Sequence, residues 1–250
     1  HIRAKQIQDV IVAFNSVFYD HPEFFWLNGA SQSQYYEYPD YVDVTLSIEP
    51  TFDMSELPER KEKVEAVIKP IVNYVKDLPD YQKVKFIYEW VIGHTDYDLD
   101  YVFDQTLYST LVERRGICTG YARSMQYILQ LCGIPCGLAT GYTPTDPHAW
   151  VVAKVNGQFC HIDPTWGDPV TADGHSDISY EYFCVSDSTI FSTHTIDGDV
   201  PYYPECPSDE NSYYVRERRY LDSFNLEAIK SWIVYDLDSS GACEFRCIDE

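Results

Sequence analysis

The chain lacks long apolar segments and has few basic residues. No run among its 250 residues approaches the roughly 18 consecutive apolar residues of a membrane span, so we expect no membrane insertion. Lys and Arg number 18 against 40 Asp and Glu, which gives a formal net charge of −22. Binding to a phosphate backbone needs a basic surface, so nucleic acid is excluded as a partner. A lysine-rich partner would be attracted, although solubility also accounts for such a charge.

Metal-binding motifs are also missing. The 8 cysteines form no Cys-x2-Cys unit, and the chain has no His-Glu-x-x-His sequence, so we expect neither a metal nor another cofactor. Any disulfide is expected among Cys206, Cys243 and Cys247, in the polar C-terminal part. The chain begins at His1 without an initiator methionine, which indicates processing or truncation. The lack of a leader sequence therefore says nothing about secretion.

The residues that are present predict a globular α+β chain. Hydrophobic residues make up 45% and aromatic residues 16%, which excludes a disordered chain. Periodicity predicts helices first and an antiparallel sheet afterwards. Residues 1–55 are expected to form an N-terminal extension that packs on a domain of residues 56–250. The expected helices cover 5–18, 55–78 with a kink at Pro70, 81–92 and 118–132, the expected strands cover 41–48, 137–143, 148–155 and 158–163, and 195–212 is expected to be a long loop.

Cys118 is placed where a thiol becomes a nucleophile. Steps of four and three residues give the predicted helix one apolar face, formed by Cys118, Ala122, Met125, Leu129 and Cys132. Free N–H groups and the helix dipole at its start stabilise an anion. Beside an imidazolium, the pKa of such a thiol falls from about 8.5 to between roughly 3.5 and 7.5. Cys118 would then exist as a thiolate.

A hairpin brings a histidine and a carboxylate together. Asn156-Gly157 lies between two alternating runs and predicts a two-residue turn. The register fixed by that turn points His148, Trp150 and Asp163 to one face of the sheet. His148 and Asp163 become diagonal neighbours, roughly 7 Å apart at the backbone. His161 shares this face and competes as a base, but its position in the register favours a structural role.

Each of these residues also has an ordinary structural explanation. A cysteine on an apolar helix face is more often a buried thiol, and His148 and Asp163 alone are ordinary residues at strand ends. The joint pattern of Cys118, His148 and Asp163 favours a catalytic triad. The backbone N–H of Cys118 is the expected first oxyanion donor, and Gln105 or Tyr108 is the expected second.

Four sequence motifs carry a resemblance to a known family. They are Gly-Ile-Cys-Thr-Gly-Tyr-Ala at 116–122, Gly-Ile-Pro at 133–135, His-Ala-Trp at 148–150 and Asp-Pro-Thr-Trp-Gly-Asp-Pro at 163–169. In this order they resemble the transglutaminase-like superfamily, especially its bacterial and mostly secreted branch. The resemblance covers about residues 80–190 and implies a secreted or cell-surface location.

The resemblance implies a papain-like fold whose nucleophile begins a central helix packed on an antiparallel sheet. It implies Cys118 as nucleophile, His148 as general base and acid, and Asp163 as the carboxylate that orients His148. Trp150 and Trp166 would pack around the site without reacting. In one departure, Val151 stands where many bacterial relatives have Asn; because it faces the other side of the strand, little effect is expected. The calcium-binding insertion of the animal enzymes is not recognisable, so calcium dependence is not implied.

Three functions fit these residues: a transglutaminase, a cysteine peptidase or amidase, and a silent binding module. In the first two, Cys118 attacks an amide and forms a thioester. If an amine resolves the thioester, the protein is a transglutaminase acting on protein or peptide glutamine; if water does, it is a cysteine peptidase or amidase. The sequence leans slightly toward the transferase, because acidic charge favours an amine acceptor. A silent binding module is the third alternative and requires Cys118 to be covered or oxidised.

Overall fold

The structure is a computed structural model that describes residues 2–98, 106–169, 177–197, 203–221, 223–239 and 243–247. Its helices are α1 (Ile7–Asp20), α2 (Leu57–Val75), α3 (Asp80–Gly93), α4 (Cys118–Leu131), α5 (Asp187–Ile190), α6 (Tyr213–Arg216) and α7 (Leu226–Ser239), with short turns η1 (Met54–Glu56) and η2 (Ser109–Glu113). Its strands are β1 (Ile2–Ala4), β2 (Leu27–Glu37), β3 (Val42–Pro50), β4 (Asp96–Tyr97), β5 (Arg115–Gly116), β6 (Cys136–Tyr142), β7 (Pro147–Val155), β8 (Gln158–Ile162), β9 (Phe183–Val185), β10 (Thr195–Ile196), β11 (Tyr220–Leu221) and β12 (Arg246–Cys247). Within these ranges no helix is long and apolar enough to cross a membrane.

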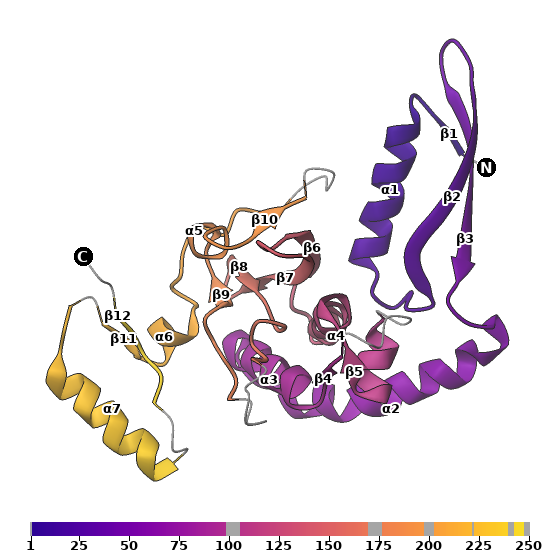
Figure 1. The fold of residues 1–250 in the computed structure, drawn as a ribbon. Helices are drawn as coiled ribbons and strands as arrows, with labels where there is room; N and C mark the ends of the chain where they lie inside the picture. Colours follow the sequence, from indigo (N-terminus) through magenta and orange to yellow (C-terminus); the bar gives the residue numbers. More distant parts are fainter. Residues whose placement is uncertain are drawn as a thin grey trace.

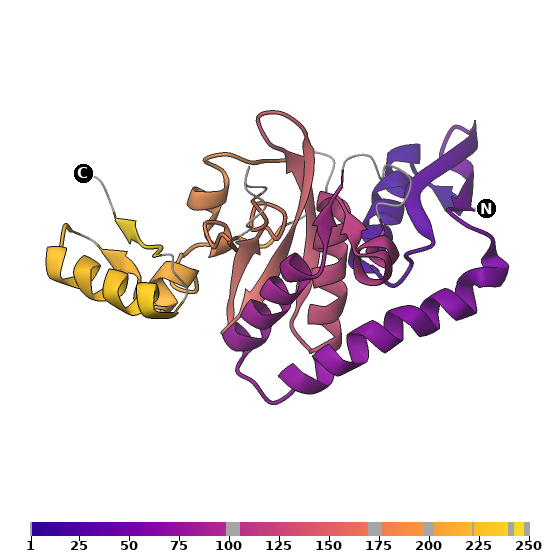
Figure 2. The same cartoon turned by 60° about the horizontal axis from the view of Figure 1, so that its bottom comes forward.

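The body is a five-stranded sheet covered by helices. Its strand order is β10-β6-β7-β8-β9, and every neighbouring pair is antiparallel. Helix α4 lies against the sheet, and α3 and the long α2 lie alongside α4 (Figure 2). The buried face of α4 includes Ala122, Met125 and Leu129, none of which is exposed to solvent. The apolar spacing of this helix thus fixes its N-terminus, and Cys118, beside the sheet.

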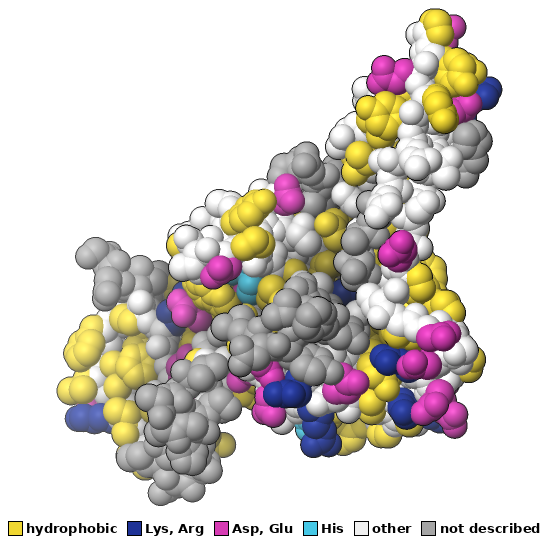
Figure 3. All heavy atoms as spheres, turned by 45° about the vertical axis from the view of Figure 1, so that its right-hand side comes forward, with side chains coloured by type: hydrophobic (Ala, Val, Ile, Leu, Met, Phe, Trp, Pro, Cys, Tyr) yellow, Lys and Arg dark blue, Asp and Glu magenta, His cyan; other side chains and the backbone are white. Residues whose placement is uncertain are grey.

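The N-terminal arm consists of α1 and the sheet β1-β3-β2 (Figure 1). Hydrogen bonds connect the arm to the body at the C-terminal end of α1. The guanidinium of Arg123 donates to the carbonyl oxygen of Phe18 over 3.2 Å, and the amide of Gln126 donates to that of Tyr19 over 2.7 Å. Both donors come from α4, so the arm meets the helix that begins with Cys118. On the face drawn in Figure 3, acidic side chains lie on both the arm and the body.

Most expected elements are present, and two expectations differ from the structure. The helix expected over 55–78 is present as α2, which continues through the exposed Pro70. The segment 195–212 is not only loop, since it contributes edge strand β10 to the main sheet. The expected C-terminal disulfide is not formed: none of Cys206, Cys243 and Cys247 is in a disulfide, and neither is any other cysteine. Cys206 is instead fully buried in a small apolar cluster under the sheet.

Candidate active site

Cys118 begins α4, with Gly116 before it and Gly120 after it. The preceding residue, Ile117, is extended, so the helix starts abruptly. The hydroxyl of Thr110 lies where a Cβ at either Gly116 or Gly120 would stand. A side chain at either position would push Thr110 away and disturb the start of the helix. The two glycines therefore leave room for Thr110 beside the start of α4, where Cys118 is partly exposed.

The β7–β8 hairpin places His148 and Asp163 as its turn predicts. Asn156 and Gly157 have φ values of 49° and 89°, as a two-residue hairpin turn requires, and Val155 pairs with Gln158. His148 Nε2 then lies 2.8 Å from Asp163 Oδ2. With Nε2 directed at the carboxylate, Nδ1 is the ring nitrogen that remains for Cys118.

The electrostatics favour an ion pair between Cys118 and His148. Burial acts to raise the pKa of the Cys118 thiol, but the hydrogen bond and charge of His148 and the N–H of Ala149 outweigh it, so the pKa is lowered. Burial likewise opposes the imidazolium, yet Asp163 and Cys118 together raise the pKa of His148 to about 10. Both shifts act in the direction of thiolate and imidazolium near neutral pH.

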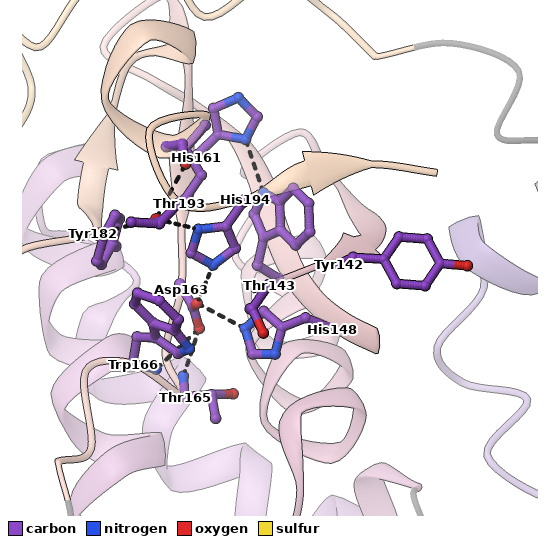
Figure 4. A network of polar contacts seen from close by, with 12 residues as sticks. Tyr142, Thr143, His148, His161, Asp163, Thr165, Trp166, Tyr182, Thr193 and His194 are labelled. Atoms are coloured by element: carbon purple, nitrogen blue, oxygen red, sulfur yellow. Dashed lines mark hydrogen bonds and ion pairs between the residues drawn. The ribbon is translucent and has the colours of Figure 1, made fainter. Parts of the chain in front are cut away.

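Asp163 is a buried carboxylate held by four N–H donors. Its Oδ1 accepts from the backbone N–H groups of Thr165 and Trp166 over 2.9 and 3.1 Å. Its Oδ2 faces His148 and also His194, whose Nε2 is 3.1 Å away. Although burial acts to raise the pKa of Asp163, the bonds from the two histidines lower it to about 2. Figure 4 shows both rings directed at this one carboxylate.

Trp150 connects the triad to a second histidine–carboxylate pair. Its indole N–H donates to His161 Nδ1 over 2.9 Å, and His161 Nε2 lies 2.9 Å from Asp187 Oδ1. The indole ring is stacked with the His148 ring at a centroid distance of 6.2 Å. Trp166 lies on the other side, with its ring 6.3 Å from that of His148. The two tryptophans expected to support the site therefore both have ring contacts with His148. His161 lies opposite Val152, as the predicted register requires.

A pocket of about 660 Å³ opens beside Cys118 and His148. Tyr97 and Thr119 form part of its wall near the thiol, and Asp146 and Asp197 contribute carboxylates. Its lining residues, all in the described part of the chain, include no lysine or arginine. The site therefore presents an acidic groove to an incoming group.

Of the two residues expected as second oxyanion donor, only Tyr108 lies in the described part of the chain. Gln105 lies outside the described residues. Tyr108 is buried, with its ring stacked on Phe25 at 5.9 Å, and it is not among the residues that line the Cys118 pocket. Tyr97 is a pocket residue that the sequence analysis did not single out. Burial, and next the negative charge at Cys118, raise its pKa, so its hydroxyl keeps its proton and can donate.

His194 is the other functional candidate missed from sequence. It follows Asp163 by 31 residues in a Thr- and Ser-rich segment without motif spacing. The signal that could have located it is the pairing of β10 with β6, in which Ile196 faces Gly141, and Gly141 faces His148. Ile196 and Gly141 are 55 residues apart, and the composition of the two segments does not indicate that they pair.

Two groups of described side chains contain three potential metal ligands each. They are His148, Asp163 and His194, and His161, Asp187 and Cys206. In the second group Trp150 donates to Nδ1 of His161, so Nε2 carries the proton and cannot bind a metal without losing it. In the first, Nε2 of both histidines is directed at Asp163. The geometry favours hydrogen-bonded pairs, and we assign neither group to a metal.

The comparisons with known proteins agree with the motifs. The family model of the transglutaminase-like superfamily matches residues 69–164. No curated protein matches the chain. Among solved structures, a TGase is 15% identical with a TM-score of 0.40, over 60% of this chain and 47% of that one. A candidate cysteine protease from Cytophaga hutchinsonii is 19% identical with a TM-score of 0.38, over 61% and 67%. The periplasmic domain of TgpA from Pseudomonas aeruginosa is 21% identical with a TM-score of 0.34, over 42% and 44%.

The chain thus spans about half the length of the TGase and TgpA structures. The matched segment runs from α2 to just beyond β8 and contains Cys118, His148 and Asp163. Its fold is α+β, with a papain-like core in which α4 packs on the antiparallel sheet. The similarity to the transglutaminase-like superfamily therefore rests on the match over residues 69–164.

Proposed function

We propose that the protein is a thiol-dependent acyltransferase of the transglutaminase type, acting on glutamine amides of proteins or peptides. The observation that carries this is the position of His148, between Cys118 and the buried carboxylate of Asp163. A thiol at a helix start, a base and an orienting group for the base are the parts that acyl transfer requires.

In acylation, the Cys118 thiolate attacks the amide carbonyl carbon. Negative charge develops on the carbonyl oxygen and is met by the backbone N–H of Cys118 at the start of α4. His148 gives its Nδ1 proton to the leaving nitrogen, ammonia departs and a thioester remains. Asp163 keeps the His148 ring oriented throughout and balances its charge. In the second half, His148 takes a proton from the incoming amine, the amine attacks the thioester, and the thiolate is released.

The second oxyanion donor belongs to the same proposal. Gln105 and Tyr108 are the candidates from sequence, and Tyr97 joins them from the structure. Tyr97 has the stronger support of the two described tyrosines, because it lines the pocket that contains Cys118. A protonated phenol there can donate to the oxyanion.

The lining of the pocket supports an amine acceptor. Asp146 is exposed at the pocket, and Asp197, directly after β10, also lines it. These carboxylates raise the local concentration of a cationic lysine side chain. This favours a lysine-bearing protein or peptide as acceptor, and with it the transferase.

Hydrolysis is the second candidate, and one observation favours it. Cys118 is partly exposed at an open pocket, so water also reaches the thioester. The silent module is the least favoured, because Cys118 is a free thiol that lines a pocket. The secreted or cell-surface location is part of the proposal and rests on the motif resemblance.

Incubation with a blocked glutamine peptide and a lysine peptide, followed by mass spectrometry, tests the reaction. We expect a crosslinked product formed with loss of ammonia, absent with Cys118→Ala. Asp146→Asn should raise the KM for the lysine peptide and leave the KM for the uncharged acceptor hydroxylamine unchanged. Deamidated or cleaved peptide without crosslinks would establish a hydrolase instead. No Cys118-dependent product would contradict both enzymatic functions for these substrates.

A further inference from the structure

We propose that His194 is a positioning residue of the active site, acting through the carboxylate of Asp163 rather than on the substrate. The proposal rests on the proposed function, because it assumes that His148 and Asp163 serve Cys118. It adds a fourth residue to the site, from a part of the chain beyond the segment 69–164 that matches the family.

The geometry of His194 allows its ring to hydrogen-bond to Asp163 but not to contact a substrate. Its side chain is completely buried, and its Nε2 lies 3.1 Å from the Asp163 oxygen that also faces His148. Its Nδ1 lies 2.9 Å from the hydroxyl of Thr193, which is 3.0 Å from the hydroxyl of Tyr182. With both nitrogens engaged and no exposure to the pocket, the ring cannot reach a substrate. Its N–H at Nε2 can hold the carboxylate.

The fold fixes His194 through a close approach of two strands. A Cβ on Gly141 of β6 would collide with the backbone carbonyl of Thr195 in β10. Glycine at this position therefore lets β10 come close to the sheet. On the other side, the backbone N–H of His194 donates to the carbonyl of Ile190 over 2.9 Å. His194 is consequently anchored by backbone contacts on both sides, beside the strand pair that carries His148.

Aromatic rings enclose His194 and keep water away from Asp163. The ring centroids of Trp166, Trp150 and Tyr182 lie 4.7, 5.2 and 5.3 Å from that of His194. In such an apolar environment an ionised carboxylate needs hydrogen-bond donors in place of water. Asp163 has two backbone donors on one oxygen, so His148 and His194 share the other. His194 thus keeps the carboxylate ionised and directed at His148 even when His148 moves its proton during catalysis.

Loss of the hydrogen bond from His194 should change the pKa of Asp163 in one direction. The hydrogen bond from His194 is one of the interactions that lower the pKa of Asp163, next in size to that from His148. Without it the pKa of Asp163 rises, and the acid limb of activity moves to higher pH. The titratable groups that interact with Asp163 are His148 of β7, His194 before β10, Tyr88 of α3 and Tyr97 of β4.

Two substitutions separate positioning from packing. His194→Phe keeps the ring volume and the aromatic contacts but removes the N–H, whereas His194→Gln returns a donor near the position of Nε2. The measurements are kcat/KM for the glutamine peptide and the rate of Cys118 alkylation by iodoacetamide from pH 4 to 9. We expect His194→Phe to lower kcat/KM by about 10- to 100-fold, the size of effect seen when a group that orients a metal-binding side chain is removed. Its acid limb should move to higher pH, and His194→Gln should recover most of both losses.

A native pH profile in His194→Phe would overturn the proposal, and so would His194→Gln behaving like His194→Phe. The unsubstituted protein separates this failure from that of the proposed function: if its Cys118 shows ordinary slow alkylation, the triad itself fails. Should His194→Phe not fold, ¹⁵N NMR of the native histidines gives the answer. A proton on His194 Nε2 that exchanges slowly with solvent supports the proposal, and a bare Nε2 at pH 7 contradicts it.

Discussion

Two histidines of the β7–β8 hairpin each lie at nearly the same distance from a carboxylate, yet the pKa values of the two rings shift in opposite directions. His148 Nε2 is 2.8 Å from Asp163, and His161 Nε2 is 2.9 Å from Asp187. The pKa of His148 is raised to about 10, whereas that of His161 is lowered. A nearby carboxylate therefore does not by itself decide whether a histidine carries charge.

The opposite pKa shifts of His148 and His161 follow from what lies at Nδ1 of each ring. His148 faces the Cys118 thiol, which becomes a second anion when it ionises. His161 Nδ1 accepts a hydrogen bond from the indole N–H of Trp150. Protonation of His161 would place a second proton on Nδ1, where it would face the indole N–H, donor against donor. Burial, the largest influence on His161, then outweighs Asp187, and the nearby His194 adds to the lowering. Asp187 is also 38% exposed, whereas Asp163 is completely buried, so water weakens the second pair.

Asp163→Asn should have the largest effect in this comparison. The amide oxygen would replace Oδ1, which accepts from Thr165 and Trp166. The amide NH2 would then face His148 and His194, donor against donor. His148 would adopt the tautomer with its proton on Nδ1 and no charge, so we expect kcat/KM to fall by about 10⁴-fold, as in other triads. Steady-state kinetics measures this, and a loss below tenfold would mean that the carboxylate does not orient His148.

Trp150→Phe should have an intermediate effect. It leaves His161 Nδ1 as a buried acceptor without its donor, which costs about 1–3 kcal/mol of unfolding free energy. Because the folded pKa of His161 is lowered, native stability declines as pH falls below about 6.5, where the unfolded chain gains a proton. Without the indole donor the pKa of His161 should rise, and this acid-side decline should shrink. Urea unfolding at pH 5 and pH 8 checks both points, and an unchanged pH dependence would contradict them.

Asp187→Asn should have the smallest effect and is the matched control for Asp163→Asn. The side chain accepts from His161 and from the backbone N–H of Cys206, and the amide NH2 of the asparagine cannot accept, so one of the two bonds is lost. Partial exposure lets water replace it, and we expect a loss of about 1 kcal/mol in unfolding free energy. The kcat/KM should stay close to that of the native protein. A loss as large as that from Asp163→Asn would mean that the two pairs act as one unit.

Much of the hairpin and helix geometry could be predicted, because it depends on short-range rules. A two-residue turn fixes the register of β7 and β8, and that register places Asp163 beside His148. The apolar spacing of α4 fixes which side of the helix is buried. In both, residues close in sequence determine the outcome.

The remaining parts of the site depend on long-range contacts. Edge strand β10 is two residues long. It pairs closely with β6 because Gly141 has no Cβ, which would collide with the backbone of Thr195. From sequence, residues 195–212 are expected to be a loop, so nothing placed the preceding His194 beside the site. Trp150 was expected beside the site, but its bond to His161 depends on the rotamers of two buried rings. No periodicity in the sequence reports such contacts.

The pH profile of Cys118 alkylation tests the central claim most directly. Iodoacetamide labelling with mass spectrometry should be confined to Cys118 and remain fast well below pH 9, the ordinary thiol range, because the thiol pKa is lowered. The imidazolium that pairs with the thiolate should be lost only as pH rises through about 10, and His148→Ala should return Cys118 to slow labelling. Slow labelling of native Cys118 that rises only near pH 9, unchanged in His148→Ala, would contradict the activated pair.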